Sequence, residues 1–286
     1  MADNGSAILM ADYLVTSTEL KSVADAIRAK GGTTEQLAFP AGFISAVESI
    51  QSGGGGGAKE PYIEETYDAN GNLIDANLVG YTTIRPYAFN KCPNLALTSL
   101  PSGITSIGED AFSSCRKLAL TSLPSGVTSI GAAAFYACSE LALTSLPSGI
   151  TSIGSNAFGN CTKLALTSLP SGIKSIVSNT FSGCRSLALT SLPSGLTSVE
   201  SNAFYSCTKL ALTSLPSGIT SIGSNAFYGC GGLTSITFKG KPNSIHSKAF
   251  SNCPNLKTIN VPWASGEVAN APWGATKATI NYNYTG

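Results

Sequence analysis

The sequence predicts a solenoid, in which the chain winds through stacked coils of equal length. Its eight cysteines recur with a constant 23-residue period, and eight phenylalanines keep the same period three residues ahead of them. The cysteines are Cys92, Cys115, Cys138, Cys161, Cys184, Cys207, Cys230 and Cys253. The phenylalanines are Phe89, Phe112, Phe135, Phe158, Phe181, Phe204, Phe227 and Phe250. A unit as short as one period cannot bury its own apolar side chains, so the eight coils form a core only by stacking on one another.

Each coil of this solenoid, which spans residues 81–262, is predicted to contain two extended pieces and a turn. An apolar residue lies eight residues before each cysteine, and a leucine lies three residues after it. A Pro-Ser-Gly turn, such as the one at 124–126, separates the extended pieces. We expect the Ala-Phe segment before each cysteine to form a short helical or 3-10 turn.

The cysteines raise the question of a disulfide framework. One cysteine per coil places neighbouring thiols about 4.8 Å apart with parallel Cβ vectors, which is beyond the usual Cβ–Cβ distance of a disulfide. No histidine or second cysteine joins each thiol to complete a metal site. We therefore expect buried, reduced thiols that pack as small apolar groups, and no bound metal or cofactor. Reduced thiols also fit folding in a cytosol.

The overall composition limits the possible partners. The chain has 286 residues, of which 43% are hydrophobic and 12% charged, and its formal net charge is +1. This balance gives no support for a nucleic-acid partner or an anionic membrane surface. No apolar run approaches the roughly 20 residues of a membrane span, and residues 1–10 do not have the pattern of a secretory signal. We therefore expect neither membrane insertion nor a cleaved leader.

Residues 1–52 are predicted to form a separate small helical unit. Thr16 and Glu19 have the spacing of a capping box, and apolar residues then recur at helical intervals up to Ile27. A second short helix is expected from about Pro40. Two short helices bury little core alone, so we expect this unit to anchor the chain to a partner or to copies of itself. The five glycines at 53–57 form a flexible linker behind it.

Caps are predicted at both ends of the solenoid. Residues 58–80 read as a hairpin with a type I′ turn at Asn70-Gly71, which covers the first coil. Residues 263–286 contain Trp263 and Trp273 and are expected to cover the last coil.

A row of leucines distinguishes six coils from the last two. The segment Leu-Ala-Leu-Thr-Ser-Leu-Pro-Ser-Gly occurs unchanged six times, with a leucine five residues after the cysteine. These leucines are Leu97, Leu120, Leu143, Leu166, Leu189 and Leu212. The last two coils place Ile236 and Ile259 six residues after the cysteine instead, and in a strand the two positions face opposite sides. Either a bulge turns the leucines inward, which we favour, or they form an outward stripe that meets a partner or a second copy.

The residues next to each cysteine vary within this constant frame. The two residues before the cysteine and the two after it differ from coil to coil, which indicates exposure to solvent. Tyr136, Tyr205 and Tyr228 lie at equivalent places among them. Aromatic rings beside polar neighbours suit contact with a sugar or a protein, although ordinary exposed tyrosines would give the same pattern.

The residues provide no catalytic constellation. The one histidine, His246, stands where most coils have glycine and reads as a polar turn residue. Without a second histidine, zinc-hydrolase chemistry and a histidine-dependent triad have little support. We therefore expect that this protein is not an enzyme.

The repeat resembles the BspA-like class of leucine-rich repeats. The likeness lies in Ile-Thr-Ser-Ile-Gly-Ser-Asn-Ala-Phe-Tyr-Gly-Cys at 219–230 and Leu-Thr-Ser-Ile-Thr-Phe at 233–238, and it covers about two-thirds of the chain. The resemblance implies a right-handed solenoid with a parallel β-sheet on one side. Proteins of this class serve as surface adhesins and host-interaction proteins of bacteria, some protists and phages.

The flanking segments are similar to parts of tail-associated proteins in phages of gut Firmicutes. The similarity lies in residues 11–15, 23–28 and 39–43 and in residues 261–276. It implies a non-enzymatic virion protein, assembled in the cytoplasm of the bacterial host, that binds other virion proteins through residues 1–52. It also implies a homo-oligomer, with a trimer favoured, whose solenoid contacts a host cell-surface protein or glycan. Two alternatives stay open, namely a cellular BspA-like adhesin at the bacterial surface and a purely structural virion decoration or assembly subunit.

Overall fold

The computed structural model describes residues 8–10, 13–15 and 62–285, and the chain divides into one unit before Pro61 and one from Pro61 onward. In the first unit, β1 (Ile8–Met10) pairs with β2 (Tyr13–Val15) in an antiparallel arrangement, which the sequence analysis did not predict. The helices expected after Thr16 and the glycine linker at 53–57 lie outside the described residues.

The second unit begins with a hairpin of β3 (Tyr62–Tyr67) and β4 (Leu73–Val79). Its loop is not the expected type I′ turn, because Gly71 has a positive φ of 77° and Asn70 does not. The Asp68 carboxylate accepts hydrogen bonds from the backbone N–H groups of Asn70 and Asn72, both at 2.9 Å. These bonds and the amide of the Asn72 side chain hold a longer loop, from 68 to 72, in place of a two-residue turn.

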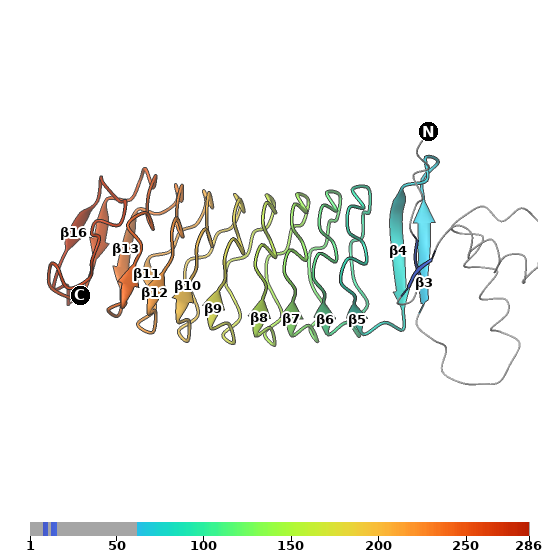
Figure 1. The fold of residues 1–286 in the computed structure, drawn as a ribbon, viewed down its shortest axis with the longest axis horizontal. Helices are drawn as coiled ribbons and strands as arrows, with labels where there is room; N and C mark the ends of the chain where they lie inside the picture. The colour runs from blue at the N-terminus through green and yellow to red at the C-terminus, as the bar shows by residue number, and fades with distance from the viewer. Residues whose placement is uncertain (1–7, 11–12, 16–61, 286) are drawn as a thin grey trace, which may run out of the picture. The chain divides into compact units, whose positions relative to one another are not determined.

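Eight short parallel strands stack along one side of the solenoid (Figure 1). Each has two residues, and in every pair of hydrogen-bonded strands the buried isoleucine or valine lies opposite the equivalent residue of the next coil, as Ile84 does to Ile107. The strands are β5 (Thr83–Ile84), β6 (Ser106–Ile107), β7 (Ser129–Ile130), β8 (Ser152–Ile153), β9 (Ser175–Ile176), β10 (Ser198–Val199), β12 (Ser221–Ile222) and β14 (Ser244–Ile245). The sequence period is therefore the spacing between successive coils.

This row of strands is interrupted between β8 and β9, which leaves two four-stranded sheets. Four coils have glycine directly after the strand, and a Cβ added at Gly154 would lie 2.4 Å from the backbone nitrogen of Ala132. Val177 occupies this place in the coil of β9. Glu200 also occupies it, yet its N–H still reaches the carbonyl of Ile176 at 2.9 Å. The branch at Cβ distinguishes Val177, and we attribute the interruption to it.

The segment before each cysteine consists of linked turns. In the described part of the chain no segment is helical, so the expected helical or 3-10 turn is wrong. In the second coil, Asp110 and Ser114 have positive φ angles of 51° and 66°, and such residues end any helical run. Phe112 between them donates its N–H to Ala134 of the next coil at 2.8 Å, while Cys115 closes a turn onto the Phe112 carbonyl at 3.0 Å. Hydrogen bonds within a coil thus alternate with hydrogen bonds between coils.

The phenylalanines form a continuous stack through the core. Neighbouring ring centroids lie between 5.0 and 5.6 Å apart, and the ring planes differ by at most 14°. All eight rings are at most 1% exposed. Offset stacking of this kind adds to the free energy gained by burying the rings.

The thiols lie beside this stack and are all free. Seven are buried, and Cys92 of the first coil is half-buried because no earlier coil covers it. Each buried sulfur lies close to the phenylalanine carbonyl of the preceding coil, as Cys115 Sγ does to the Phe89 oxygen at 2.9 Å. The same Phe89 oxygen accepts the N–H of Cys92 at 3.3 Å. The thiols therefore act as hydrogen-bond donors between coils as well as small apolar groups.

The leucine row points into the core. Leu97 is 5% exposed and the other five leucines are at most 1% exposed, so none of the six can form an outward stripe. The inward orientation that we favoured is therefore correct, and their assignment as binding residues is wrong. Leu212 and Ile236 both reach the core, although they stand five and six residues after their cysteines.

This difference in register weakens pairing along that side. In the repeated coils one backbone bond links neighbouring segments here, as from the Ala119 N–H to the Leu97 oxygen at 3.1 Å. The Thr-Ser-Leu residues that follow form no strand until β11 (Ser214–Leu215). A regular parallel sheet runs only from β11 through β13 (Ser235–Phe238) and β15 (Thr258–Asn260) to β16 (Thr279–Asn281).

The C-terminal residues add a further turn, so that the solenoid has about nine. Trp273 follows Phe250 at the interval that separates successive phenylalanines, is fully buried, and accepts the Phe250 N–H at its carbonyl at 2.9 Å. Its indole Nε1–H donates to the Ala269 oxygen at 2.7 Å. Trp263 packs edge-on against Phe238 at a centroid distance of 5.3 Å. The Trp263 and Trp273 rings thus cover the core at the end of the phenylalanine stack.

Leu143→Ala is expected to lower the free energy of unfolding by about 2–5 kcal/mol, because it leaves a cavity in the middle of the core. Leu146→Ala, in the same coil, is the matched control, because that side chain is half-buried and its loss costs less. Urea unfolding followed by circular dichroism measures both. Equal effects of the two substitutions would show that Leu143 does not pack in the core.

The intact protein is expected to react with a thiol reagent at one site well before the others. Cys92 is the half-buried thiol, and the remaining seven are covered by neighbouring coils. Mass spectrometry after brief native labelling should find the label on Cys92, and all eight thiols should react in denaturant. Rapid labelling of a central thiol such as Cys161 in the native state would contradict the packing described here.

The stability of the solenoid is expected to fall in alkaline solution. Burial raises the pKa of Cys115 to about 12 and that of Cys253 to about 11, and it raises the pKa of Cys161 well above the usual range. Below about pH 8 these thiols are protonated in both states, so their full contribution is present at neutral pH. Above that pH the unfolded chain loses protons that the folded chain keeps, which costs about 1.4 kcal/mol per thiol and pH unit.

Urea midpoints at neutral pH and near pH 10 measure this loss. A chain carrying Cys161→Ala should show a shallower dependence on pH, since one titrating thiol is absent. A midpoint that does not change with pH would mean that the thiols ionise equally in both states.

Candidate binding surface

The described residues provide surfaces rather than an enclosed reaction site. Between residues 62 and 285, no group of three or more histidines, cysteines and acids is placed to hold a metal ion. His246 lies in an exposed turn, where its ring Nδ1 accepts the N–H of Lys248 at 3.1 Å. The buried thiols have raised pKa values because of their burial, and this opposes formation of the nucleophilic thiolate. Within the described ranges, no helix has the length and apolar character needed to cross a membrane.

Variable residues flank the cysteine of each coil, and others follow the strand, at 108–110 and the equivalent places. We call the two residues before and the two residues after each cysteine, from Cys115 to Cys230, the variable corner. The residue before the cysteine has a positive φ in each of these coils. In three of the six, the residue after the cysteine bonds back to it, as the Arg116 N–H does to the Ser114 oxygen at 3.0 Å. The chain therefore reverses around the buried cysteine. The two residues after it are exposed or half-buried in every coil, whereas Ser113, two residues before Cys115, is buried.

The three tyrosines of the variable corner fall into two groups. Tyr205 and Tyr228 stand on neighbouring coils and stack with ring centroids 4.7 Å apart and planes 3° apart. Tyr136, three coils earlier, is 37% exposed. Its hydroxyl accepts the side-chain N–H of Asn160 at 3.3 Å, and its ring lies against the Gly159 backbone. The rings are thus held in place by neighbours while part of each face or edge stays accessible.

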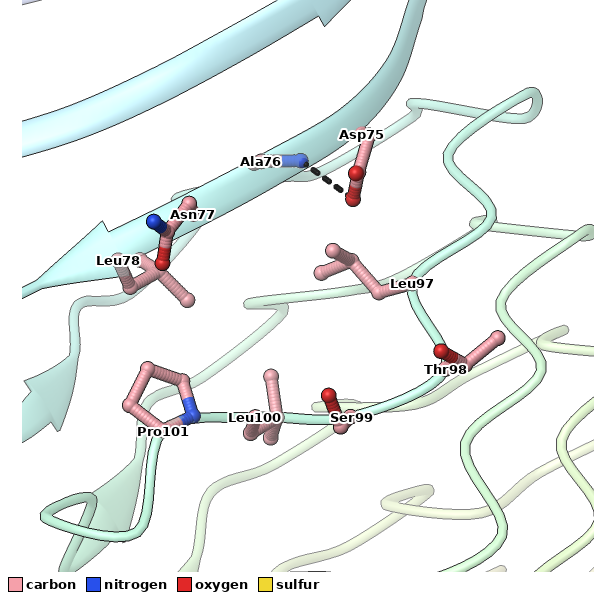
Figure 2. A pocket seen from close by; sticks show the side chains of 9 residues that line it. All are labelled: Asp75, Ala76, Asn77, Leu78, Leu97, Thr98, Ser99, Leu100 and Pro101. Carbon is pink, nitrogen blue, oxygen red and sulfur yellow. Dashed lines mark hydrogen bonds between the residues drawn. The ribbon is translucent and has the colours of Figure 1, made fainter.

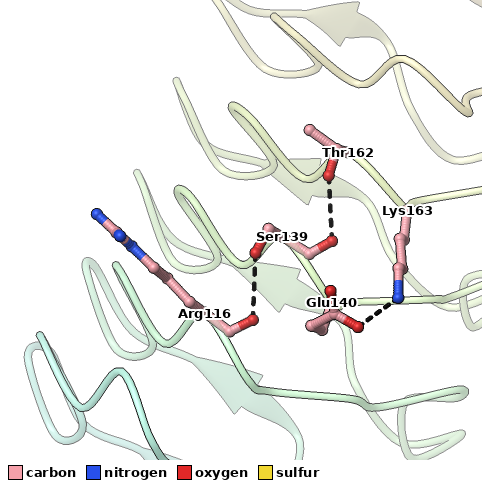
Figure 3. A network of polar contacts seen from close by, with 5 residues as sticks. All are labelled: Arg116, Ser139, Glu140, Thr162 and Lys163. Atoms are coloured by element: carbon pink, nitrogen blue, oxygen red, sulfur yellow. Dashed lines mark hydrogen bonds and ion pairs between the residues drawn. The ribbon is translucent and has the colours of Figure 1, made fainter.

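Short hydroxyl side chains link the coils on the other side of the cysteine (Figure 3). Ser139 Oγ donates to the Arg116 oxygen at 3.3 Å, and Thr162 Oγ1 donates to the Ser139 oxygen at 3.2 Å. Lys163 forms an ion pair with Glu140 of the preceding coil. Both charged groups are well exposed, so this pair adds little stability. Lys163 and Glu140 therefore do not contribute to the packing of the core.

A shallow groove of about 520 Å³ runs beside these residues. It is lined by Ala96 and Ala119 on one side and by Arg116, Lys117, Ser139 and Glu140 on the other. The alanines lie on successive coils and lack long side chains, and the lining residues come from three coils.

A second hollow, of about 370 Å³, lies between β4 and residues 97–101 (Figure 2). Its wall on β4 is partly closed by Asp75, whose carboxylate accepts the N–H of Ala76 at 2.9 Å. The segment opposite pairs with β4 through one bond, from the Ala96 N–H to the Ile74 oxygen. The hollow begins where backbone hydrogen bonding between β4 and this segment ends. There the Asp75 carboxylate accepts the N–H of Ala76 on β4.

The sequence predicts the tyrosines and the variable positions as candidate contact residues, but it does not single out the basic residues as a group. Arg116, Lys117, Lys163, Arg185 and Lys209 all fall within the variable corner and are all exposed. All five stand one or two residues after a cysteine, and this shared position in the repeat is the sequence pattern that indicates a basic group. It was hidden by the low net charge of the whole chain.

Comparisons with known proteins identify the repeat. The family model for the BspA type leucine-rich repeat region matches residues 82–211 and 162–271. Among curated proteins, none matches the sequence significantly.

Several solved structures are similar to this chain. A leucine-rich cell surface protein from Faecalibacterium prausnitzii A2-165 is 24% identical over 72% of each chain, with a TM-score of 0.48. A leucine-rich repeat protein from Bacteroides ovatus ATCC 8483 is 22% identical over 79% of this chain and 76% of its own, with a TM-score of 0.44. The leucine-rich repeat protein of T. pallidum is 27% identical over 60% of this chain and 87% of its own, with a TM-score of 0.47.

The family assignment rests on the repeat itself. The matched residues, 82–271, make up about two-thirds of the sequence and contain all eight Phe-Cys coils described above. The chain therefore belongs to the family of BspA-type leucine-rich repeat proteins.

Proposed function

We propose that this protein is a non-enzymatic, adhesin-like binding protein of a bacterial cell surface, and that it contacts a host cell-surface protein or glycan through the variable corner. The observation that carries this proposal is the separation of constant from variable residues. The segment Leu-Ala-Leu-Thr-Ser-Leu-Pro-Ser-Gly is unchanged in six coils, whereas the residues on both sides of the cysteines differ. Packing of the coils alone does not require the residues of the variable corner to differ from coil to coil.

The tyrosines support a role in recognition. A tyrosine brings a large amphipathic contact area at a small cost in conformational entropy, and tyrosine is enriched among residues that dominate binding energy. Tyr136 is restrained by Asn160, and Tyr205 and Tyr228 restrain each other by stacking. Because the rings are already ordered, little further entropy is lost on binding.

A second candidate is a tail-associated virion protein of a phage. It rests on the resemblance of residues 11–15, 23–28, 39–43 and 261–276 to such proteins that the sequence suggests. In this case residues 1–52 bind other virion proteins, the protein forms a trimer, and the solenoid contacts the surface of a bacterium. The two candidates share the binding surface and differ in the cell that carries the partner.

Binding of the fluorescently labelled full chain to a panel of bacterial and epithelial cells tests both candidates. Changing Tyr136, Tyr205 and Tyr228 together to alanine is expected to lower cell binding about tenfold or more, because ordered aromatic anchors carry much of a binding energy. Tyr87→Ala with Tyr284→Ala is the matched control, since both tyrosines are exposed and lie outside the variable corner.

Binding to epithelial cells that depends on the three tyrosines supports the adhesin, and binding confined to bacteria supports the tail protein. If no cell type binds the chain, both recognition proposals fail. Equal losses in the two sets of variants would remove the variable corner as the contact surface.

A further inference from the structure

Positive charge is concentrated on the solenoid. Residues 62–285 contain 13 lysines and arginines against nine aspartates and glutamates, although the whole chain has a net charge of only +1. Within the variable corner the imbalance is larger, because five basic residues face a single acid, Glu140. A low overall charge therefore coexists with a local basic surface, and local charge governs which ligands approach.

The basic residues form a row along the stacking direction. Lys117, Lys163 and Lys209 stand at the same position, two residues after the cysteine, on every second coil. Successive phenylalanine rings lie about 5.5 Å apart, so these lysines recur at roughly twice that spacing. Arg116 and Arg185 stand one residue earlier in their coils. We call these five residues the basic row.

The tyrosines lie next to the basic row at the same corner. The Ser114 N–H donates to the Tyr136 oxygen at 2.7 Å, and the Arg116 N–H donates to the Ser114 oxygen at 3.0 Å. Two hydrogen bonds thus connect the backbone of a tyrosine position to that of a basic position. The surface therefore combines cations with amphipathic rings.

We propose that the basic row binds a linear anionic polysaccharide laid along the stacking direction, with its carboxylate or sulfate groups at the lysines and arginines. This inference rests on the proposed function and names the class of its ligand. Lys117, Lys163 and Lys209 recur on every second coil and so fit a polymer with a regular repeat, and tyrosine rings present flat faces to sugar rings. The groove beside Ala96 and Ala119 borders Arg116 and Lys117, so it adjoins the N-terminal end of the basic row.

The charge density favours a polysaccharide over a nucleic acid. Double-stranded DNA presents one charge per about 1.7 Å, and proteins that bind it use dense basic surfaces. The basic row has five cations over the five coils from Cys115 to Cys207, which is close to one per coil. This lower density matches an acidic polysaccharide, in which whole sugar rings separate the anions.

Glu140 lowers the positive charge of the basic row. It lies on the one coil of the row that has no basic residue, and it forms an ion pair with Lys163. Its carboxylate repels an anionic ligand and occupies a lysine that would otherwise contact it. Replacing this carboxylate with a neutral amide therefore strengthens binding.

The test measures binding of the full chain to three immobilised polysaccharides by biolayer interferometry. Heparin is sulfated, polygalacturonate is carboxylated and dextran is neutral. We expect binding to one or both acidic polymers and none to dextran, with an affinity that falls as salt rises from about 50 to about 200 mM. The combined variant Lys117→Gln, Lys163→Gln and Lys209→Gln should weaken binding about tenfold or more.

Two further variants make the result specific. The combination Lys174→Gln, Lys239→Gln and Lys248→Gln removes the same charge from exposed lysines outside the variable corner and should leave binding within about twofold of the original. Glu140→Gln should increase the affinity. Equal losses in the two lysine variants, or no binding to either acidic polymer, would overturn the proposal, as would tighter binding to a single-stranded oligodeoxythymidylate.

The same variants separate this inference from the proposed function. If cell binding persists when the three lysines of the basic row are changed, the adhesin stands and the polysaccharide ligand is wrong. If the chain binds acidic polysaccharide but no cell, the basic row stands and the cellular role is wrong.

Discussion

The contact between one coil and the next is the interaction on which the whole solenoid depends. Phe112 illustrates it, because its ring stacks between two other phenylalanines and its carbonyl accepts both the N–H of Cys115 and the thiol of Cys138. Every coil must present its ring, thiol and carbonyl at the same height for these contacts to form. This requirement explains why all the intervals are equal in length and why the ends need large closing groups such as Trp273.

Much of this architecture follows from the period alone, because equal spacing of Phe and Cys has few other physical explanations. The inward direction of Leu143 also followed from the constancy of its segment. Local backbone conformation was harder to foresee, since Ala-Phe is compatible with a helical turn. Asn156, Asn179, Asn202 and Asn225 at one position were a usable signal for left-handed residues, which asparagine tolerates better than most. The thiol hydrogen bonds could not be predicted, because they depend on where a neighbouring coil places its carbonyl.

Two sets of residues in each coil have different roles, one in packing and one at the candidate surface. Buried positions are nearly invariant and fix the geometry, so the corner residues can change without altering the fold. The tyrosines were recognisable in advance because an aromatic residue at an exposed repeat position is unusual. The basic residues were not, because the acids elsewhere in the chain cancel them in any overall sum. Their local positive charge becomes visible only when the coils are aligned, because Lys117 and Lys209 then occupy the same position of the repeat.

The equivalence of successive interfaces also affects how such a gene changes. Each of the four inner segments among the six identical ones joins the same partners on both sides, so loss or gain of one repeat unit there brings together two coils that already fit. Unequal recombination between nearly identical repeats therefore yields shorter or longer proteins with an intact interior. A change in repeat number alters the count of contact positions in a line, and with it the avidity for a polymeric partner, without creating any new contact.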